Sequence, residues 1–284
     1  MLTGPQFWRL ITVPPLTLST LRRVGVTPAE VRYPAGGRWA GVGTRPSILY
    51  VVLPALTPNP DALYDQLAGT VPDFPTGALS SHCQMLFELL CTFTGRRSWV
   101  ERSGGSSLYA AELLRGLPGA KVIYLTRERA ANVRSMSRHP SFQLGQLRLE
   151  FQVRCGFDPY VDEWPADARI PDDLRMCLPD RLNRDLLTAR GEQLDRFELM
   201  CAYLTSAAEQ ALADAPPERL LRLRYEDLLA DPVGRLEAVG RFLEFDDWSA
   251  WASRVAHRVI APAAGSPHPL RPATPVPVED GRPG

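Results

Sequence analysis

Short apolar runs separated by helix-length segments fill the middle and the end of this chain. Residues 120–126 (AKVIYLT) and 219–225 (RLLRLRY) are dominated by branched apolar side chains, which predicts two buried strands. Helical periodicity predicts a long helix over 194–215 and another over 232–245. Strands that are separated by helix-length segments pair in parallel, so the pattern predicts an α/β fold with a central parallel sheet flanked by helices.

The first half of the chain adds two more expected strands and two expected helices. Residues 46–54 (PSILYVVLP) form an apolar run between prolines and predict a buried strand. Residues 97–103 predict a strand that turns through glycines into the next helix. Residues 61–70 and 79–93 predict helices.

The remaining segments decide the expected domain organisation. Residues 141–192 mix charged and aromatic side chains without a clean period, which indicates a lid or an acceptor-binding insertion. The segment 261–284 contains seven prolines and little apolar bulk, so we expect it to be disordered. We therefore predict one α/β domain over 1–260 followed by a Pro-rich tail.

Charge and cysteine content exclude several classes of function. Lys plus Arg (32) equals Asp plus Glu (32), so nothing in the net charge favours a nucleic acid or an acidic membrane as partner. The single lysine, Lys121, lies outside any Gly-x-x-x-x-Gly-Lys-Ser/Thr motif, which excludes a P-loop nucleotide triphosphatase or kinase. Five scattered cysteines and four histidines show no metal-ligand spacing, so we expect no bound metal. Free thiols and the absence of a basic, unbroken apolar N-terminus predict a cytoplasmic protein.

A cluster of arginines begins where the expected strand 120–126 ends. Arg127 follows this strand directly, at the entrance to the next helix, where open α/β sheets bind their ligands. Its guanidinium adds donors to the unpaired N–H groups of a helix start. Ser135 follows eight residues later, about two helical turns on, so the two side chains together predict a phosphate clamp.

The expected helix 232–245 has clear boundary signals. Asp231 is suited to cap it and Pro232 to occupy its first position. Apolar residues at helical spacing predict a buried stripe: Val233, Leu236, Val239 and Leu243.

Three segments together resemble the sulfotransferases that use 3′-phosphoadenosine 5′-phosphosulfate (PAPS). Arg127 followed by Ser135 resembles the 3′-phosphate-binding segment of that family, and residues 219–245 are similar to its C-terminal signature. In the family, the position of Tyr225 often lies near the adenine. The strand that ends at Glu101 is similar to the family strand that faces the transferred group or the acceptor. The three segments occur in the family's order over roughly residues 80–245. The stretch 135–142 (SMSRHPSF) is similar to a bacterial branch of the family.

The resemblance implies a fold and a reaction. The fold would be the P-loop-like α/β type of sulfotransferases, and PAPS would be the co-substrate. A sulfuryl group would pass to a hydroxyl or an amine of a small-molecule or carbohydrate acceptor. Arg127 and Ser135 would bind the 3′-phosphate, Tyr225 would contact the adenine, and Glu101 or His139 would work near the acceptor.

One part of the family pattern is missing from the sequence. Sulfotransferases hold the 5′-phosphosulfate in a loop after their first strand, roughly Gly-x-x-Arg-x-Gly-Ser/Thr, and no strand of this chain is followed by such a loop. We expect that the first strand and its loop lie upstream of the sequence. Two alternatives stay open: a non-catalytic nucleotide-binding member of the family, and an unrelated α/β transferase or hydrolase that uses Ser103 as nucleophile.

Overall fold

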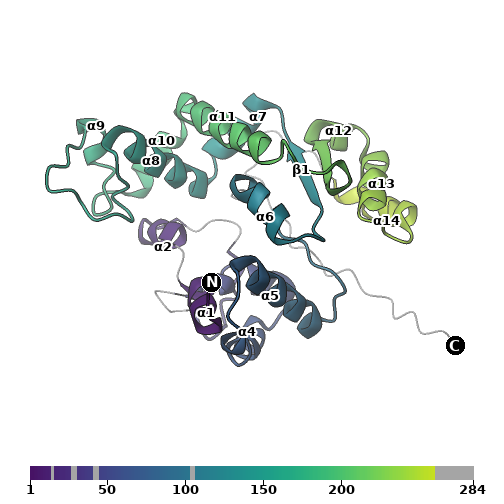
Figure 1. Cartoon of the computed structure of the whole chain (residues 1–284). Helices are drawn as coiled ribbons and strands as arrows, with labels where there is room; N and C mark the ends of the chain where they lie inside the picture. Colours follow the sequence, from purple (N-terminus) through teal and green to yellow (C-terminus); the bar gives the residue numbers. More distant parts are fainter. Residues whose placement is uncertain (14–15, 27–30, 41–44, 103–105, 260–284) are drawn as a thin grey trace.

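The protein is described by a computed structural model, which is mostly helical with a small parallel sheet (Figure 1). The coarse α/β prediction therefore agrees with the structure. The described residues are 1–13, 16–26, 31–40, 45–102 and 106–259. The predicted tail 261–284 lies outside them.

The first part of the chain is helical throughout its regular elements. These are α1 (Gly4–Thr12), α2 (Leu16–Arg23), the 3-10 helix η1 (Ser47–Leu49), α3 (Val52–Leu56), α4 (Pro60–Ala68), η2 (Val71–Asp73) and α5 (Leu79–Thr94). Helices α4 and α5 confirm the predictions for 61–70 and 79–93.

The second part of the chain carries both strands. Its elements are η3 (Ser106–Tyr109), α6 (Ala110–Gly116), β1 (Val122–Thr126), α7 (Arg129–Ser137), α8 (Pro140–Cys155), α9 (Asp172–Arg175), α10 (Arg184–Gly191), α11 (Leu194–Ala211), η4 (Pro217–Arg219), β2 (Leu220–Arg224), α12 (Tyr225–Ala230), α13 (Pro232–Phe242), α14 (Trp248–Val255) and η5 (Ala256–Arg258).

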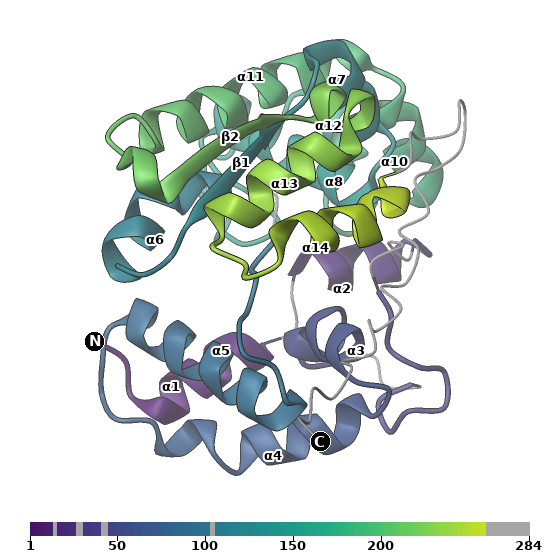
Figure 2. The same ribbon diagram turned by 90° about the vertical axis from the view of Figure 1, so that its right-hand side faces the viewer.

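Strands β1 and β2 pair in parallel, from Val122 opposite Leu220 to Thr126 opposite Arg224. This pairing confirms the strands predicted over 120–126 and 219–225, and α11 and α13 confirm the helices predicted between and after them. Val122 and Tyr124 of β1 pack against α6 and α11. Figure 2 shows the two strands with α11 on one side and α13 on the other.

Two predicted strands are wrong. Residues 46–54 form η1 and the start of α3, where Ile48, Leu49, Tyr50 and Leu53 are buried in helical packing and Val51 and Val52 are exposed. A short apolar run is compatible with either structure, and Pro54 is tolerated because it lies in the first turn of α3. The described residues of the other segment, 97–102, contain no strand, and Val100 is 86% exposed. Within the described residues the sheet consequently has two strands.

The segment 141–192 is more regular than its sequence pattern indicated. It contains most of α8, together with α9 and α10. Three apolar side chains of α8, namely Leu144, Leu147 and Phe151, are completely buried. The segment is therefore part of a packed core, and its possible role as a lid or an acceptor site stays a prediction.

The start of α13 forms as its sequence predicts. The Asp231 side chain accepts a hydrogen bond from the backbone N–H of Gly234, and Pro232 occupies the first helical position. The predicted apolar stripe is only partly buried, since Val239 is buried and Val233 is exposed.

The buried apolar residues form separate cores. One lies among α1, η1, α3, α4, η2 and α5 and contains Phe7, Leu49, Leu53, Leu67 and Val71, among others. Another is built around α8 and includes Leu21 of α2, which attaches that helix to the second part of the chain. Helices α5 and α6 also meet closely, because a Cβ atom at Gly116 would lie 2.5 Å from the Cβ of Ser80.

A smaller core joins α7 to α11 through Val133, Met136, Phe197 and Cys201. It fixes the helix that follows β1 relative to the helix that packs on the sheet. Across the described ranges, no helix combines the length and the apolarity that crossing a lipid bilayer would require.

We predict that Phe197→Ala lowers the free energy of unfolding by about 3–5 kcal/mol, since it removes a fully buried ring and leaves a cavity. Tyr203→Ala on the same helix is the control, because Tyr203 is 57% exposed and should contribute much less. Urea denaturation followed by circular dichroism measures both. Equal losses for the two variants would contradict the packing of α11 on α7.

Candidate functional site

The carboxyl ends of β1 and β2 bring together two of the residues singled out in the sequence. Because Thr126 pairs with Arg224, the residues that follow them, Arg127 and Tyr225, leave the sheet side by side. The guanidinium carbon of Arg127 lies 4.9 Å from the centroid of the Tyr225 ring. This distance is within the range of a cation–π contact. Two segments almost a hundred residues apart in sequence thus form one site.

Arg127 has a positive charge available at this edge. Among the described residues, no carboxylate lies within ion-pair distance of its guanidinium, whereas the neighbouring Arg129 binds Glu198 of α11 at 2.7 Å. Arg127 and Tyr225 are both half-buried. The arrangement suits the recognition of an anion next to an aromatic group.

The N-terminus of α7 is occupied by two carboxylates. The Glu128 side chain accepts hydrogen bonds from the backbone N–H groups of Ala130 at 2.8 Å and Ala131 at 2.6 Å. The Glu226 side chain, from α12, accepts one from the backbone N–H of Glu128 at 2.8 Å. The prediction that these N–H groups are open to a ligand is therefore wrong for this state, because acidic side chains of the protein satisfy them.

These contacts favour the charged form of both acids. The hydrogen bonds from Ala130 and then Ala131 hold the pKa of the Glu128 carboxyl below its usual value. The pKa of Glu226 is likewise lowered, first by the hydrogen bond from the Glu128 backbone and further by the charges of Arg224 and Arg127. Both carboxylates are consequently ionised at neutral pH.

Ser135 lies on α7, on the helix that leaves the same edge of the sheet. It is exposed and stands six residues beyond Arg129, the first residue of the helix, which is about 9 Å along the axis. The structure therefore leaves Ser135 accessible toward the C-terminal end of α7, and none of the contacts described for it reaches Arg127.

The two residues predicted near the acceptor lie on other elements. Glu101 is exposed in the segment between α5 and η3, where its carboxylate accepts a hydrogen bond from the hydroxyl of Ser106 at 2.9 Å. Its predicted position at a strand end is wrong, because the described part of that segment is not a strand. None of the contacts described for Glu101 reaches Arg127 or Tyr225. Ser103, the alternative nucleophile, falls outside the described residues.

His139 connects α7 to α8. It follows Arg138, the C-terminal cap of α7, and is itself the N-terminal cap residue of α8, with Pro140 in the first helical position. Its ring packs edge-on against Phe142, with centroids 5.4 Å apart. This position is consistent with the expected helix boundary, and the ring contact described for His139 is with Phe142 and not with the Arg127–Tyr225 pair.

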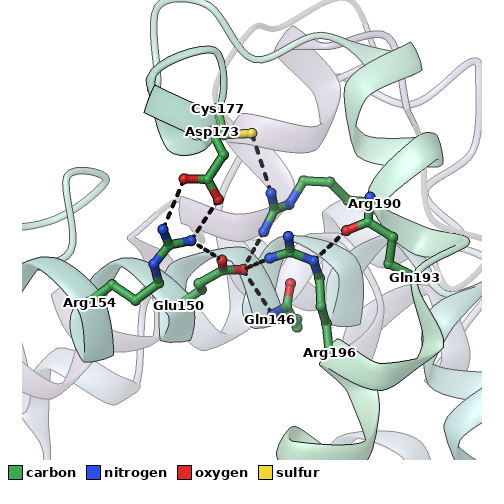
Figure 3. A network of polar contacts seen from close by, with 8 residues as sticks. All are labelled: Gln146, Glu150, Arg154, Asp173, Cys177, Arg190, Gln193 and Arg196. Carbon is green, nitrogen blue, oxygen red and sulfur yellow. Dashed lines mark hydrogen bonds and ion pairs between the residues drawn. The ribbon is translucent and has the colours of Figure 1, made fainter. Parts of the chain in front are cut away.

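A second polar cluster is buried between α8, α9, α10 and α11 (Figure 3). Its centre is Glu150 of α8, which accepts hydrogen bonds from Arg154 at 2.7 Å and from Arg190 and Arg196. Arg154 also forms two hydrogen bonds with Asp173 of α9, at 2.7 and 2.9 Å. Glu150 and the arginines bound to it therefore connect α8, α9, α10 and α11.

The arginines decide the protonation state of Glu150. Burial alone raises the pKa of this carboxyl, but the hydrogen bonds from Arg196 and Arg154 and the charge of Arg190 outweigh that effect and lower it to about 2. The side chain is only 10% exposed, so solvent screens these interactions weakly. Because the Glu150 carboxylate is buried and its charge is balanced by arginines of α8, α10 and α11, we assign this cluster a structural role.

Glu226 and Glu150 are the important residues that sequence reasoning missed. Glu128 could have been found, because an acid directly before a helix is a usual cap, but the partner of Glu226 is almost a hundred residues away. No local signal indicates such a contact.

Groups suited to a metal ion are absent from the described ranges: no three His, Cys, Asp or Glu side chains come together in the required way. Searches of family models, curated proteins and solved structures found no match to this chain. The geometry of the sheet edge and the sequence pattern are therefore the basis for a function.

We predict that Glu150→Gln lowers the free energy of unfolding at pH 7 by about 3 kcal/mol, since a shift from 4.5 to about 2 corresponds to roughly that energy. Because the folded-state pKa is lowered, this contribution is present above pH 4.5 and is lost as the pH falls toward 2. The difference between the variant and the original protein should accordingly shrink between pH 5 and pH 3.

Urea denaturation at several pH values tests this prediction. The exposed Glu163 provides a matched substitution, Glu163→Gln, which should change the free energy of unfolding little at any pH. A constant gap between Glu150→Gln and the original protein from pH 7 to pH 3 would disprove the assignment.

Proposed function

We propose that this chain is a PAPS-dependent sulfotransferase-family protein that binds the 3′-phosphate and the adenine of PAPS at the carboxyl edge of β1 and β2. The observation that carries the proposal is the contact between Arg127 and Tyr225, 4.9 Å from guanidinium carbon to ring centroid. The sequence predicts Arg127 as a ligand of the 3′-phosphate and Tyr225 as a contact of the adenine. A nucleotide with a 3′-phosphate needs both side chains in one site.

The chemistry of the edge supports this ligand. Arg127 has no carboxylate partner among the described residues and can form a charge-assisted pair with a phosphate. The Tyr225 ring offers an apolar surface for a purine. Ser135, exposed on α7, would add a neutral hydroxyl donor to the same phosphate.

In the proposed reaction, a sulfuryl group passes from PAPS to a hydroxyl or an amine of a small-molecule or carbohydrate acceptor. Catalysis would consist of positioning the two substrates in line and removing a proton from the acceptor. Glu101 and His139 are the candidate bases, and the segment 141–192 is the candidate for acceptor contacts. The five cysteines are all free, which fits the proposed cytoplasmic location.

A second candidate function is nucleotide binding without transfer. It is favoured by Glu101, which lies in an exposed segment and not at the end of a strand of the β1–β2 sheet. Labelled PAPS distinguishes the two candidates when it is incubated with a panel of hydroxyl and amine acceptors. Label in an acceptor supports the transferase, whereas tight binding without transfer supports the second function.

We predict that Arg127→Ala weakens the binding of adenosine 3′,5′-bisphosphate by about 10- to 150-fold, the effect of losing about 1.5–3 kcal/mol from a charged hydrogen bond. Ser135→Ala should weaken it by about fivefold, because a neutral hydroxyl contributes about 1 kcal/mol. Isothermal titration calorimetry measures both affinities.

The matched control is Arg115→Ala, which removes the same charge from an exposed position on α6, before the start of β1 and so at the opposite edge of the sheet. It should leave the affinity within about twofold, since an exposed charge at that distance is screened by salt. If Arg115→Ala and Arg127→Ala weaken binding equally, the effect is general electrostatics and the proposed phosphate site is wrong.

A further inference from the structure

The Glu226 carboxylate reaches from α12 across the sheet edge to the start of α7. One of its oxygens accepts the backbone N–H of Glu128 at 2.8 Å. The charges of Arg224 and Arg127 both act on it, and the nearest Arg224 nitrogen lies 3.8 Å from the other oxygen. Glu226 therefore holds a negative charge among the donors that the proposed phosphate site would use.

The second oxygen of Glu226 is poorly satisfied. It is buried and has no hydrogen-bond partner among the residues that the structure describes, since 3.8 Å is too long for a hydrogen bond to Arg224. A buried charged oxygen without a donor is costly. The side chain as a whole is 35% exposed, so the carboxylate can turn out to solvent without crossing the core.

We propose that Glu226 is an internal competitor of the phosphate: its carboxylate occupies the Glu128 amide in the empty site and is displaced when the 3′-phosphate binds. This inference rests on the proposed function and adds a residue that determines specificity. The displaced carboxylate gives up the hydrogen bond from the Glu128 amide and its ion pair with Arg224, and the incoming phosphate takes over that amide together with the charges of Arg127 and Arg224.

The exchange favours one class of anion. A phosphate monoester carries a charge of about −1.5 to −2 at neutral pH and three acceptor oxygens, whereas Glu226 carries one charge and uses one oxygen at this amide. Anions with a single charge gain no electrostatic advantage over the resident carboxylate. Glu226 thus selects for a terminal phosphate and against carboxylates and other monoanions.

The test is calorimetric titration of adenosine 3′,5′-bisphosphate into the original protein, Glu226→Gln and Glu226→Ala. The Gln variant keeps the size and an acceptor oxygen and removes the charge. We expect both variants to bind roughly tenfold more tightly than the original protein, because a like charge within a few ångströms of the phosphate is removed. Adenosine 5′-monophosphate, which lacks the 3′-phosphate, should show no such gain.

Glu218→Gln is the control, since Glu218 is exposed at the opposite end of β2 and the substitution removes the same charge. It should leave the affinity unchanged within about twofold. Thermal melts establish whether each variant is folded. If Glu226→Gln does not fold, Glu226→Ala provides an independent measurement.

Each outcome separates this inference from the proposed function. If the original protein binds and the Glu226 variants bind no more tightly, the inference fails and the proposed function stands. Weaker binding by the variants would mean that Glu226 contacts the ligand directly, which also overturns the inference. Binding by the variants alone supports the inference and refutes the proposed function for the native chain, and binding by none of the proteins refutes both.

Discussion

The parallel pairing of β1 with β2 is the constraint on which the candidate site depends. Five residues of each strand pair in register, and the last pair, Thr126 with Arg224, determines which residues leave the sheet together. A register shift of one residue would turn alternate side chains to the other face and separate Arg127 from Tyr225. The long connection between the strands makes this pairing entropically costly to form. Leu114 of α6 and Leu212 at the C-terminal end of α11 pack with residues of both strands and provide compensating apolar contacts.

Arginine–carboxylate contacts recur in the second part of the chain. Glu150 gathers three arginines from three helices, and Asp158 binds Arg148 at 2.7 Å in a part-buried pair. Such groups require close to complete hydrogen bonding, because an unpaired buried charge is costly. At the sheet edge the described residues leave this pairing incomplete: they provide no hydrogen-bond donor for one Glu226 oxygen and no carboxylate within ion-pair distance of Arg127. The groups at the sheet edge can therefore exchange their partners for a ligand, whereas the Glu150 cluster stabilises the packing of the helices.

Sequence patterns predicted the elements whose evidence is local. The two strands, the long helix α11 and the capped start of α13 were expected from apolar runs, periodicity and Asp231. The helix α8 was missed, because Gln146 and Glu150 occupy positions on its buried side and break the apolar period. Only the arginines of α10 and α11 make those positions compatible with burial. The run 46–54 was misassigned because a short apolar stretch is compatible with a strand or a buried helix turn.

The sequence by itself determined which chemical groups stand at the ends of which elements: Arg127 and Tyr225 each directly follow a strand, and Ser135 lies two turns into the next helix. It also determined the caps and most helix boundaries, since these depend on residues a few positions apart. Tertiary structure alone decided that Arg127 lies against Tyr225, that Glu226 binds the Glu128 amide, and that three arginines converge on Glu150. Each of these contacts joins residues from different elements, and their geometry follows from strand register and helix packing, which no local pattern of side chains specifies.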